Sequence, residues 1–421
     1  MNKLFKFPFL MAFAIALGTG FASCSDDDDT DSDHNVGGAG TVTAETFKSV
    51  LEQYVNYTVI PTYKTLADKA IILDKAVNRL NEDRSDANLA VACLAWRDAR
   101  QYWELSESFL YGAAADYSID PHIDSWPLDK TALDNLLGNN YLLDNFDAGN
   151  LGNNLLGFHG LEYILFSEGK PKGVSNITEN QYKYAVGVAD DLAVQCVRLE
   201  ASWAGVDALS DVKTGIEIED EDGNAFDATK EELLEANELT PTRNYGEELI
   251  AAGEQGNKNY KTSTSGIAEI IQGCFDIADE VGNSKIYTPW YKQEVLEVES
   301  WYSFNSLKDY VDNIRSIENA YLGGMADVAE FDYTSQGEGK TAAMKGNRNE
   351  ALSVSACVKK LDADLDTKLK AAIANAIEKI NGIPAPYRNN LDKTTEIKAA
   401  MDACNELATT LTEIKQRIEE N

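Results

Sequence analysis

The sequence predicts an all-α protein built of two similar helical-bundle domains, and three observations lead to this fold class. Long stretches of the chain repeat apolar residues at the three- and four-residue spacing of a helix with one buried face. Glycine and proline interrupt these stretches where helices are expected to end. The chain has 421 residues, which is more than one domain usually contains, because single hydrophobic cores seldom grow past about 250 to 300 residues.

The N-terminal segment differs in composition from the rest of the chain. Lysines precede a short apolar stretch, and small residues then precede Cys24. This is the anatomy of a signal peptide, residues 1–23, followed by a cysteine for lipid attachment; ordinary cleavage beside an incidental cysteine is the alternative. The aspartates and glycines of residues 24–42 predict a lipidated acidic linker. We therefore expect an outer-membrane lipoprotein, on the cell surface or the periplasmic face, that contacts the membrane only through its lipid anchor.

Residues 43–205 are predicted to form the first bundle. Ser85 is placed to cap a long helix that Gly112 stops, and residues 112–152 are predicted to be a long irregular connection. Connections of that length are uncommon and are often functional. The expected helices cover residues 43–59, 62–82, 85–111, 153–167 and 177–205.

The second bundle is expected over residues 241–421, after an insertion at residues 206–240. The Asp222-Gly223 pair predicts a small hairpin inside the insertion. Ser306 and Asp309 have the spacing of a capping box at a helix start. The helices expected here cover residues 263–281, 290–301, 306–322, 350–380 and 394–420.

The composition limits the classes of ligand. The net charge of −33 repels nucleic acid and attracts cations. The sequence has three histidines, and His34 lies in the acidic linker, so a three-histidine zinc site in the folded body is excluded. The cysteines after Cys24 are widely spaced without a CxxC pair, which argues against a zinc ribbon. Whether any of them forms a disulfide stays open.

His159 and Glu162 are the first candidate ligands. They lie three residues apart and therefore share one helix face, which is also the apolar face of that short helix. Gly157 and Gly160 weaken the same helix, which suggests a close backbone approach beside a polar site. The alternative is a core histidine that bonds to its own-turn glutamate.

Glu104 and Glu107 form a second acidic pair at the same spacing, and structural ion pairing with Arg97 or Arg100 is its alternative. If the two pairs face each other across a bundle, three carboxylates and an imidazole converge, as in half of a carboxylate di-iron site. Asp124 is the first choice for a fifth ligand and Asp120 the second, with Trp126 in the same loop. Such oxygen-rich ligation favours iron, or manganese, with zinc as a further candidate. The alternative for this loop is that its aromatic residues and prolines only pack it against the protein.

Five segments of the chain resemble the imelysin family. GFHGLEYILF at residues 157–166 resembles its GxHxxE signature, and four more segments follow the same order as in the family. They are WELSESFLYG at 103–112, IDSWP at 123–127, GCFDIADEVGNSKI at 273–286 and ESWYSFNSLKDYVDNI at 299–314, the last of which contains Ser303. One departure is Tyr111-Gly112-Ala113, where the family usually has FGP.

The resemblance implies two helical bundles with the signature near their junction, in an exported and often lipid-anchored protein linked to iron uptake. It also implies an ExxE pair beside the HxxE, which Glu104 and Glu107 match. We expect a protein that binds a metal ion or an iron-bearing ligand and works with iron-uptake partner proteins. Two alternatives stay open: an imelysin-type metallopeptidase, and a surface partner-binding protein with a structural HxxE. HGLEY lacks the second histidine of an HExxH zinc peptidase, so the enzyme question is not decided.

Overall fold

The computed structural model describes residues 40–140, 146–214 and 243–421. Helices dominate these residues, so the predicted all-α class is confirmed. Within them the paired strands are β1 (Phe166–Ser167) and β2 (Lys170–Pro171), which run antiparallel. The signal peptide, Cys24, the acidic linker and the Asp222-Gly223 hairpin lie outside the described residues. No helix of the described part is long and apolar enough to cross a membrane.

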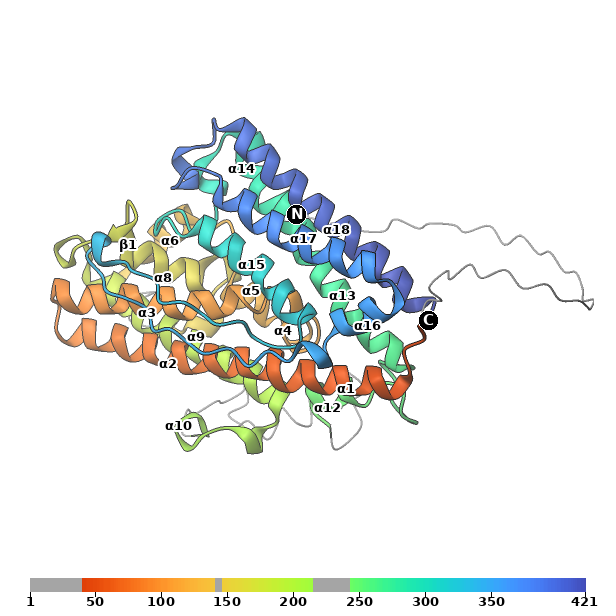
Figure 1. Cartoon of the computed structure of the whole chain (residues 1–421). Helices are drawn as coiled ribbons and strands as arrows, with labels where there is room; N and C mark the ends of the chain where they lie inside the picture. The colour runs from red at the N-terminus through yellow and green to blue at the C-terminus, as the bar shows by residue number, and fades with distance from the viewer. Residues whose placement is uncertain (1–39, 141–145, 215–242) are drawn as a thin grey trace, which may run out of the picture. The chain divides into compact units, whose positions relative to one another are not determined.

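The first long helix begins near the described N-terminus and continues through a π-helical turn. Thr43 caps it by accepting a hydrogen bond from the Thr46 amide. Its parts are α1 (Ala44–Tyr54), the π turn (Val55–Val59) and α2 (Ile60–Glu82). In Figure 1, α2 lies along α3 (Asp86–Glu104) and α9 (Glu179–Ala204), while α1 reaches the second half of the chain and contacts α13.

The predicted helix over residues 85–111 is shorter in the structure. Ser85 caps α3 as expected, but α3 ends at Glu104 and a 3-10 turn follows at Glu107–Phe109. Tertiary contacts with the second half explain the early end. The Ser108 amide donates to Ser316 Oγ, and a Cβ on Gly273 would lie 2.2 Å from the Ser108 carbonyl oxygen. The chain therefore turns to pack closely against that half.

The connection after Gly112 is folded into short helices. They are α4 (Ala113–Asp116), α5 (Ile119–Ile123), α6 (Lys130–Leu137) and 3-10 turns at Ala148–Asn150 and Asn153–Leu155. The signature helix α8 (Gly157–Leu165) follows and packs on α9. Further short elements are 3-10 turns at Val174–Asn176 and Val206–Ala208 and the helix α10 (Asp211–Thr214).

The second half contains longer helices in a second packed group (Figure 1). These are α12 (Tyr245–Ile250), α13 (Ser263–Glu280), a π turn (Val281–Ile286), α14 (Tyr287–Lys292), α15 (Ser306–Tyr321), α16 (Val354–Leu361), α17 (Ala363–Asn381) and α18 (Thr394–Glu419). The 3-10 turns here are Val295–Glu297, Thr334–Gln336, Glu350–Leu352 and Tyr387–Asn389.

Three predictions for this half were wrong. The helix expected over 290–301 ends at Lys292, because Gln293 adopts a left-handed conformation. The helix expected over 350–380 is divided at Asp362, whose side chain caps α17. The capping box at Ser306 does not form: Asn305 is the N-cap residue and makes no side-chain cap, while Ser306 Oγ donates to the Glu299 carbonyl oxygen.

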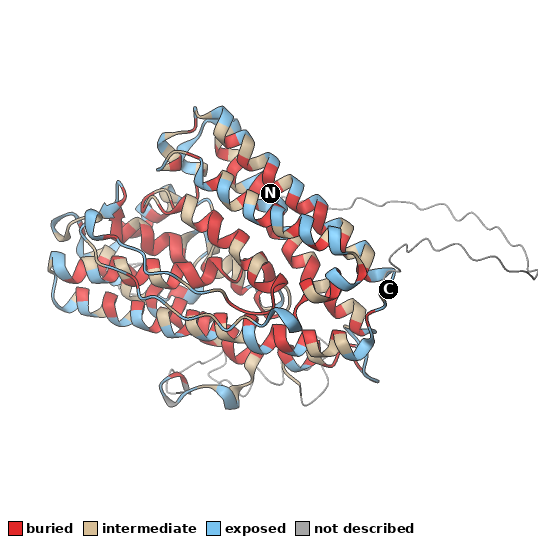
Figure 2. Cartoon of the chain, in the orientation of Figure 1, coloured by how far each residue is buried: buried red, intermediate tan, exposed pale blue. Residues whose placement is uncertain are grey.

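The buried faces of both helix groups meet in one continuous hydrophobic core (Figure 2). α3 contacts α15, and α13 contacts both α1 and the turn after α3. Residues Ala39–Asn421 form one compact unit. The division into domains at 43–205 and 241–421 stays a prediction. The five cysteines of the described residues are free and buried.

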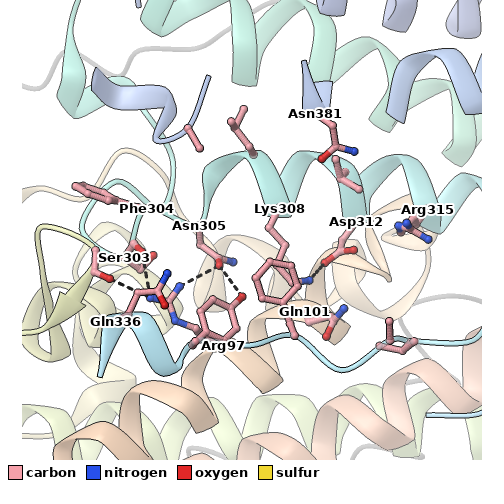
Figure 3. Close-up of a pocket in the computed structure, with 18 of the residues that line it drawn as sticks. Arg97, Gln101, Ser303, Phe304, Asn305, Lys308, Asp312, Arg315, Gln336 and Asn381 are labelled. Carbon is pink, nitrogen blue, oxygen red and sulfur yellow. Dashed lines mark hydrogen bonds and ion pairs between the residues drawn. The ribbon is translucent and has the colours of Figure 1, made fainter. Parts of the chain in front are cut away.

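A long segment, residues 322–353, crosses from α15 to α16 and is called the strap below. Two isolated bridges, Val328 with Met344 and Asp332 with Lys340, fold it back on itself. Glu338 of the strap forms a buried ion pair with Arg97 of α3, at 2.7 Å. Arg97 also donates to Asn305 Oδ1, as Figure 3 shows. The strap is thereby fixed over α3 and α15.

Candidate functional site

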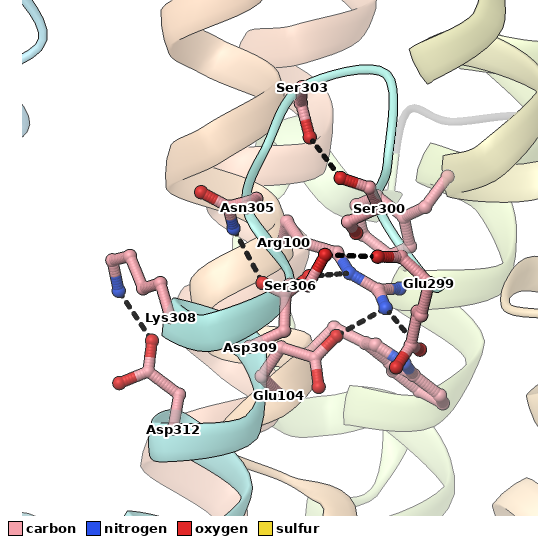
Figure 4. Close-up of polar contacts among 12 residues, drawn as sticks. Arg100, Glu104, Glu299, Ser300, Ser303, Asn305, Ser306, Lys308, Asp309 and Asp312 are labelled. Atoms are coloured by element: carbon pink, nitrogen blue, oxygen red, sulfur yellow. Dashed lines mark hydrogen bonds and ion pairs between the residues drawn. The ribbon is translucent and has the colours of Figure 1, made fainter. Parts of the chain in front are cut away.

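The guanidinium of Arg100 lies at the centre of a buried acidic cluster, and its side chain is fully buried. It pairs with Glu104 one turn later on α3 and with Asp124 from the end of α5. From the second half, Glu299 lies 2.8 Å and Asp309 lies 3.7 Å from its nitrogens. Figure 4 shows Arg100 reaching between Glu104, Glu299 and Asp309. One side chain therefore joins both halves of the chain.

His159 on α8 faces this cluster. Its Nε2 atom lies 3.0 Å from Asp124 Oδ1, although it makes no well-aligned hydrogen bond there. Trp103 Nε1 donates to the other oxygen of Asp124, at 2.5 Å, and the Trp126 ring packs on the imidazole with centroids 4.5 Å apart. These contacts fix Asp124, the loop carboxylate that the sequence predicted as a ligand.

Glu162 lies on the opposite edge of the imidazole. Its Oε2 atom is 3.3 Å from His159 Nδ1, while its Oε1 atom accepts hydrogen bonds from both the amide and the hydroxyl of Ser303, each at 2.7 Å. Both carboxylate oxygens are thus engaged away from Asp124. Glu162 holds the ring, and Ser303 holds Glu162, which leaves Nε2 directed at the acidic cluster.

Two glycines allow these elements to approach. Gly157 has a φ of +68°, and a Cβ there would lie 2.0 Å from the Ile123 carbonyl oxygen. A Cβ on Gly160 would lie 2.1 Å from the Tyr184 hydroxyl of α9. Any side chain at Gly157 would push α8 away from the chain just before Asp124. The glycines therefore bring His159 and Asp124 together.

The acidic pair at the end of α3 is divided between two environments. Glu104 contacts Arg100 and accepts a hydrogen bond from Asn313 of α15. Glu107, which follows the end of α3, lies instead 3.6 Å from Lys285 of the π turn after α13. Of the ion pairs that the sequence left open, Arg100 with Glu104 forms, whereas Arg97 pairs with Glu338 of the strap.

A cavity of about 360 Å³ opens beside the cluster. Carboxylates of the α3 turn, the α5 loop and the second half line it, together with Trp126 and Lys285. Its acidic lining residues are Glu107, Asp120, Asp124, Glu280, Glu297 and Glu299. Lys285 Nζ lies 3.2 Å from Glu299 Oε1, so the cavity also holds one ammonium group.

Sequence reasoning missed the contribution of the second half. Glu299, Glu280 and Asp309 join the cluster, and Arg100 and Lys285 supply its permanent positive charges. One segment that resembles the imelysin family, residues 299–314, begins at Glu299, and another, residues 273–286, ends one residue after Lys285. The resemblance therefore contained a signal for Glu299 and Lys285. It did not indicate a role for either residue.

Two groups of side chains have a geometry that could hold a metal ion. Ligand atoms of Asp124, His159 and Glu299 lie within 4.8 Å of one another, and so do those of Glu104, Glu107 and Asp124. Asp124 belongs to both groups. Glu162 belongs to neither. The Glu299 Oε2 and His159 Nε2 atoms are buried without a well-aligned hydrogen bond to the described part of the protein.

Burial raises the pKa values of most carboxyls in and around this cluster. It raises the pKa of Asp120 to about 7, with repulsion from Asp124 as the second cause, and the pKa of Asp309 to about 6 against the effect of Arg100. Burial also raises the pKa values of Glu104, Glu107 and Glu280. The ionised forms of these carboxyls are therefore destabilised, because burial outweighs the nearby positive charge.

The pKa of Asp124 shifts in the opposite direction, because two basic groups lie beside this carboxyl. Burial alone would raise the pKa of Asp124, but the Arg100 guanidinium and the neighbouring His159 hold it below its ordinary value. Burial would lower the pKa of His159, and the adjacent Asp124 and Glu162 carboxylates raise it overall. Asp124 is therefore a permanent anion, able to hold a cation or a protonated imidazole.

Comparisons with known proteins place this chain in a family. Residues 59–414 match the family model described as Imelysin, Peptidase_M75. The iron-regulated protein A of Synechococcus elongatus is 26% identical over 288 residues, 68% of each chain.

Solved structures of similar proteins also point to the imelysin fold. A crystal structure described as an iron-regulated protein A precursor from Parabacteroides distasonis has a TM-score of 0.71 at 29% identity, covering 91% of this chain and 97% of that one. An imelysin-like protein from Psychrobacter arcticum shares the fold, with a TM-score of 0.57 at 13% identity over 90% and 95% of the chains. Because its family match extends over most of its length, this chain belongs to the imelysin family.

Proposed function

We propose that the protein binds a metal ion, with iron as the favoured metal, at the acidic cavity beside His159. The observation that carries the proposal is an excess of buried carboxylates over buried cations. Arg100 and Lys285 are the basic side chains that contact the cluster. Against them stand the carboxylates of Glu104, Glu107, Asp124, Glu299 and Asp309, whose side chains are buried, with the half-buried Asp120 at the cavity wall. Burying carboxylates without compensation is expensive, and a bound cation would relieve the cost.

The ligand atoms favour a particular class of metal. Asp124, His159 and Glu299 would supply two oxygens and one nitrogen, and Glu104 and Glu107 could complete the sphere from the neighbouring group. Mixed carboxylate and imidazole ligation suits iron and manganese, with zinc as the other candidate. The names of the relatives, iron-regulated protein A, support a role connected with iron.

Glu162 and Ser303 would act indirectly in this proposal. A metal-bound histidine normally bonds through its second nitrogen to a carboxylate, which fixes the ring. Glu162 stands at that position, 3.3 Å from His159 Nδ1, and Ser303 orients it. We therefore assign His159 as a ligand, and Glu162 as the residue that positions it.

The test compares metal binding by the wild type and by site variants. Metal-stripped protein is titrated with ferrous, ferric, manganous and zinc ions while the melting temperature and the bound metal are measured. We expect the best ion to stabilise the wild type, because a ligand that binds only the folded state raises the melting temperature. Glu104→Gln, Glu107→Gln and His159→Ala should lose most of that shift, and acid should weaken it as ligands protonate.

His122→Ala is the matched control, because His122 pairs with Asp191 outside the cluster. Equal shifts in all the variants would mean that ions meet only the acidic surface and would overturn the proposal. Cleavage of casein by the wild type that His159→Ala abolishes would instead support a peptidase.

We also propose that the protein is anchored by lipid on Cys24 and acts at the outer membrane with iron-uptake partner proteins. The signal-peptide anatomy and the acidic linker support this. Fractionation after labelling with a palmitate analogue tests it. Wild type should carry the label in outer membranes, whereas Cys24→Ala should be unlabelled and leave that fraction. An unlabelled wild type would contradict the anchor.

A further inference from the structure

A second and larger cavity lies between α3, α15 and the strap, and it shares no lining residue with the acidic cavity. Its volume is about 880 Å³. Figure 3 shows polar side chains from these elements around it, including Gln101 of α3 and Arg315 of α15, with Asn381 from the end of α17 at the opposite wall. Pockets of roughly 300 to 1,000 Å³ are typical of sites for small organic ligands.

The carboxylates that line this cavity are all neutralised by basic partners. Glu168 pairs with Arg388 at 2.9 Å and Asp327 pairs with Lys345 at 2.6 Å. The third, Asp312, pairs with a lysine one turn earlier on α15. The lining therefore contributes no free negative charge, although the chain as a whole carries −33.

On the walls formed by α3 and α15, the side chains of Gln101 and Arg315 are unpaired in the part of the chain that the structure describes. Among the described residues, no hydrogen bond or ion pair engages the side chain of Arg315, which is half-buried. Gln101 is only 8% exposed, yet its amide also makes no hydrogen bond within the described part of the chain. Figure 3 shows both without a dashed contact. The Gln101 amide therefore remains available to a polar atom of a ligand in the cavity.

Apolar side chains also contribute to the wall. Leu105, Leu307, Val311, Val328 and Ile383 contribute aliphatic surface, and Phe331 of the strap adds an aromatic ring. An apolar wall with a few fixed polar groups selects ligands that have an apolar body and a single charged group. The unpaired guanidinium sets the sign of that charge, because Arg binds carboxylates and sulfonates through its planar fork.

We propose that this cavity binds an organic anion with an apolar or aromatic body, whose acidic group pairs with Arg315 and accepts a hydrogen bond from Gln101. This site is distinct from the proposed metal site beside His159, because the two cavities share no lining residue.

The test uses two fluorescent probes with the same aromatic frame. Anilinonaphthalene sulfonate carries an anionic group, and phenylnaphthylamine lacks it. We expect the purified full-length mature protein to bind the sulfonate more tightly. Arg315→Gln should weaken sulfonate binding by about tenfold or more while leaving the neutral probe nearly unchanged, since only the charged contact is lost. Arg315→Lys should retain part of the preference.

Arg79→Gln is the matched control, because Arg79 is an exposed arginine at the end of α2, away from the cavity lining. Gln101→Leu should weaken sulfonate binding without changing the charge, and Val311→Trp should fill the cavity and exclude both probes. Thermal melts establish that each variant is folded before titration. Sulfonate affinity that is unchanged in Arg315→Gln, or binding of both probes that is unchanged in Val311→Trp, would overturn the proposal.

Discussion

At the scale of single residues, two basic side chains partly neutralise the acidic cluster. Arg100 contacts carboxylates from both halves of the chain, and its planar fork is held by several of them at once. Lys285 is a single ammonium beside Glu107 and Glu299. An ammonium on a flexible stem is more easily displaced than a guanidinium in several ion pairs. In the proposed metal site, Lys285 would therefore compete with the metal ion for Glu299.

The first prediction concerns this competitor. Lys285→Met should strengthen metal binding about tenfold, because Glu299 would no longer be shared with the ammonium. The metal-free variant should be less stable than wild type, since two buried carboxylates lose their partner. Titration of metal-stripped protein with manganous and zinc ions measures the first effect, and thermal melts measure the second.

Lys368→Met serves as the control, because Lys368 forms an exposed ion pair with Glu413, and neither residue lines the acidic cavity. It should behave like wild type in both measurements. Weaker metal binding by Lys285→Met would show that the ammonium supports the site instead of competing for it.

At the scale of elements, the site depends on how closely α8 meets the end of α5. The Gly157 backbone has a φ of +68° and passes so near Ile123 that no side chain fits. This contact places His159 against Asp124. The sequence indicated a close approach from the two glycines in a short helix, but it did not identify the partner. The early end of α3 likewise followed from contacts with α13 and α15.

Gly157→Ala should therefore destabilise the protein by about 3 kcal/mol or more and abolish metal binding, because both backbone strain and a clash arise. Gly337→Ala isolates the strain alone. Gly337 also has a positive φ, of +89°, but a Cβ there meets nothing within 4 Å. Gly337→Ala should lower the free energy of unfolding by about 1 kcal/mol and leave metal binding intact. Chemical denaturation measures both, and equal costs would contradict the close-contact argument.

At the scale of the whole described chain, the two helix groups are joined by shared elements. α1 and α2 continue through a π turn, so that α1 packs on α13 while α2 packs on α3 and α9. The buried cluster draws Arg100 from one half and Glu299 from the other. Separating the halves would expose apolar surface and leave buried charges unpaired, so they should not unfold independently.

We therefore expect one cooperative thermal transition for the metal-free mature protein. Calorimetry should give equal calorimetric and van't Hoff enthalpies, which is the mark of a two-state process. Two resolved transitions, one of them lost in a fragment that spans residues 43–205, would instead support two separately folding domains.

The sequence by itself determined the fold class and much of the helix pattern, because helical periodicity and capping are local properties. Ser85 caps α3, and His159 and Glu162 share one buried face of α8, as their spacing required. The candidate residues Glu104, Glu107, Asp124 and His159 also do lie around one buried cluster. Local patterns report which face of an element is buried.

Tertiary structure decided what each buried face meets. Glu162 accepts hydrogen bonds from Ser303, 141 positions later, and Arg100 donates to Glu299, 199 positions later. No local pattern encodes such pairings, because the spacing of residues along a helix does not specify its neighbour. The end of α3, the role of Glu299 and the position of Lys285 therefore emerged only when the helices packed. Burial then set the charge of the cluster, since carboxylates gathered from distant segments lost their water together.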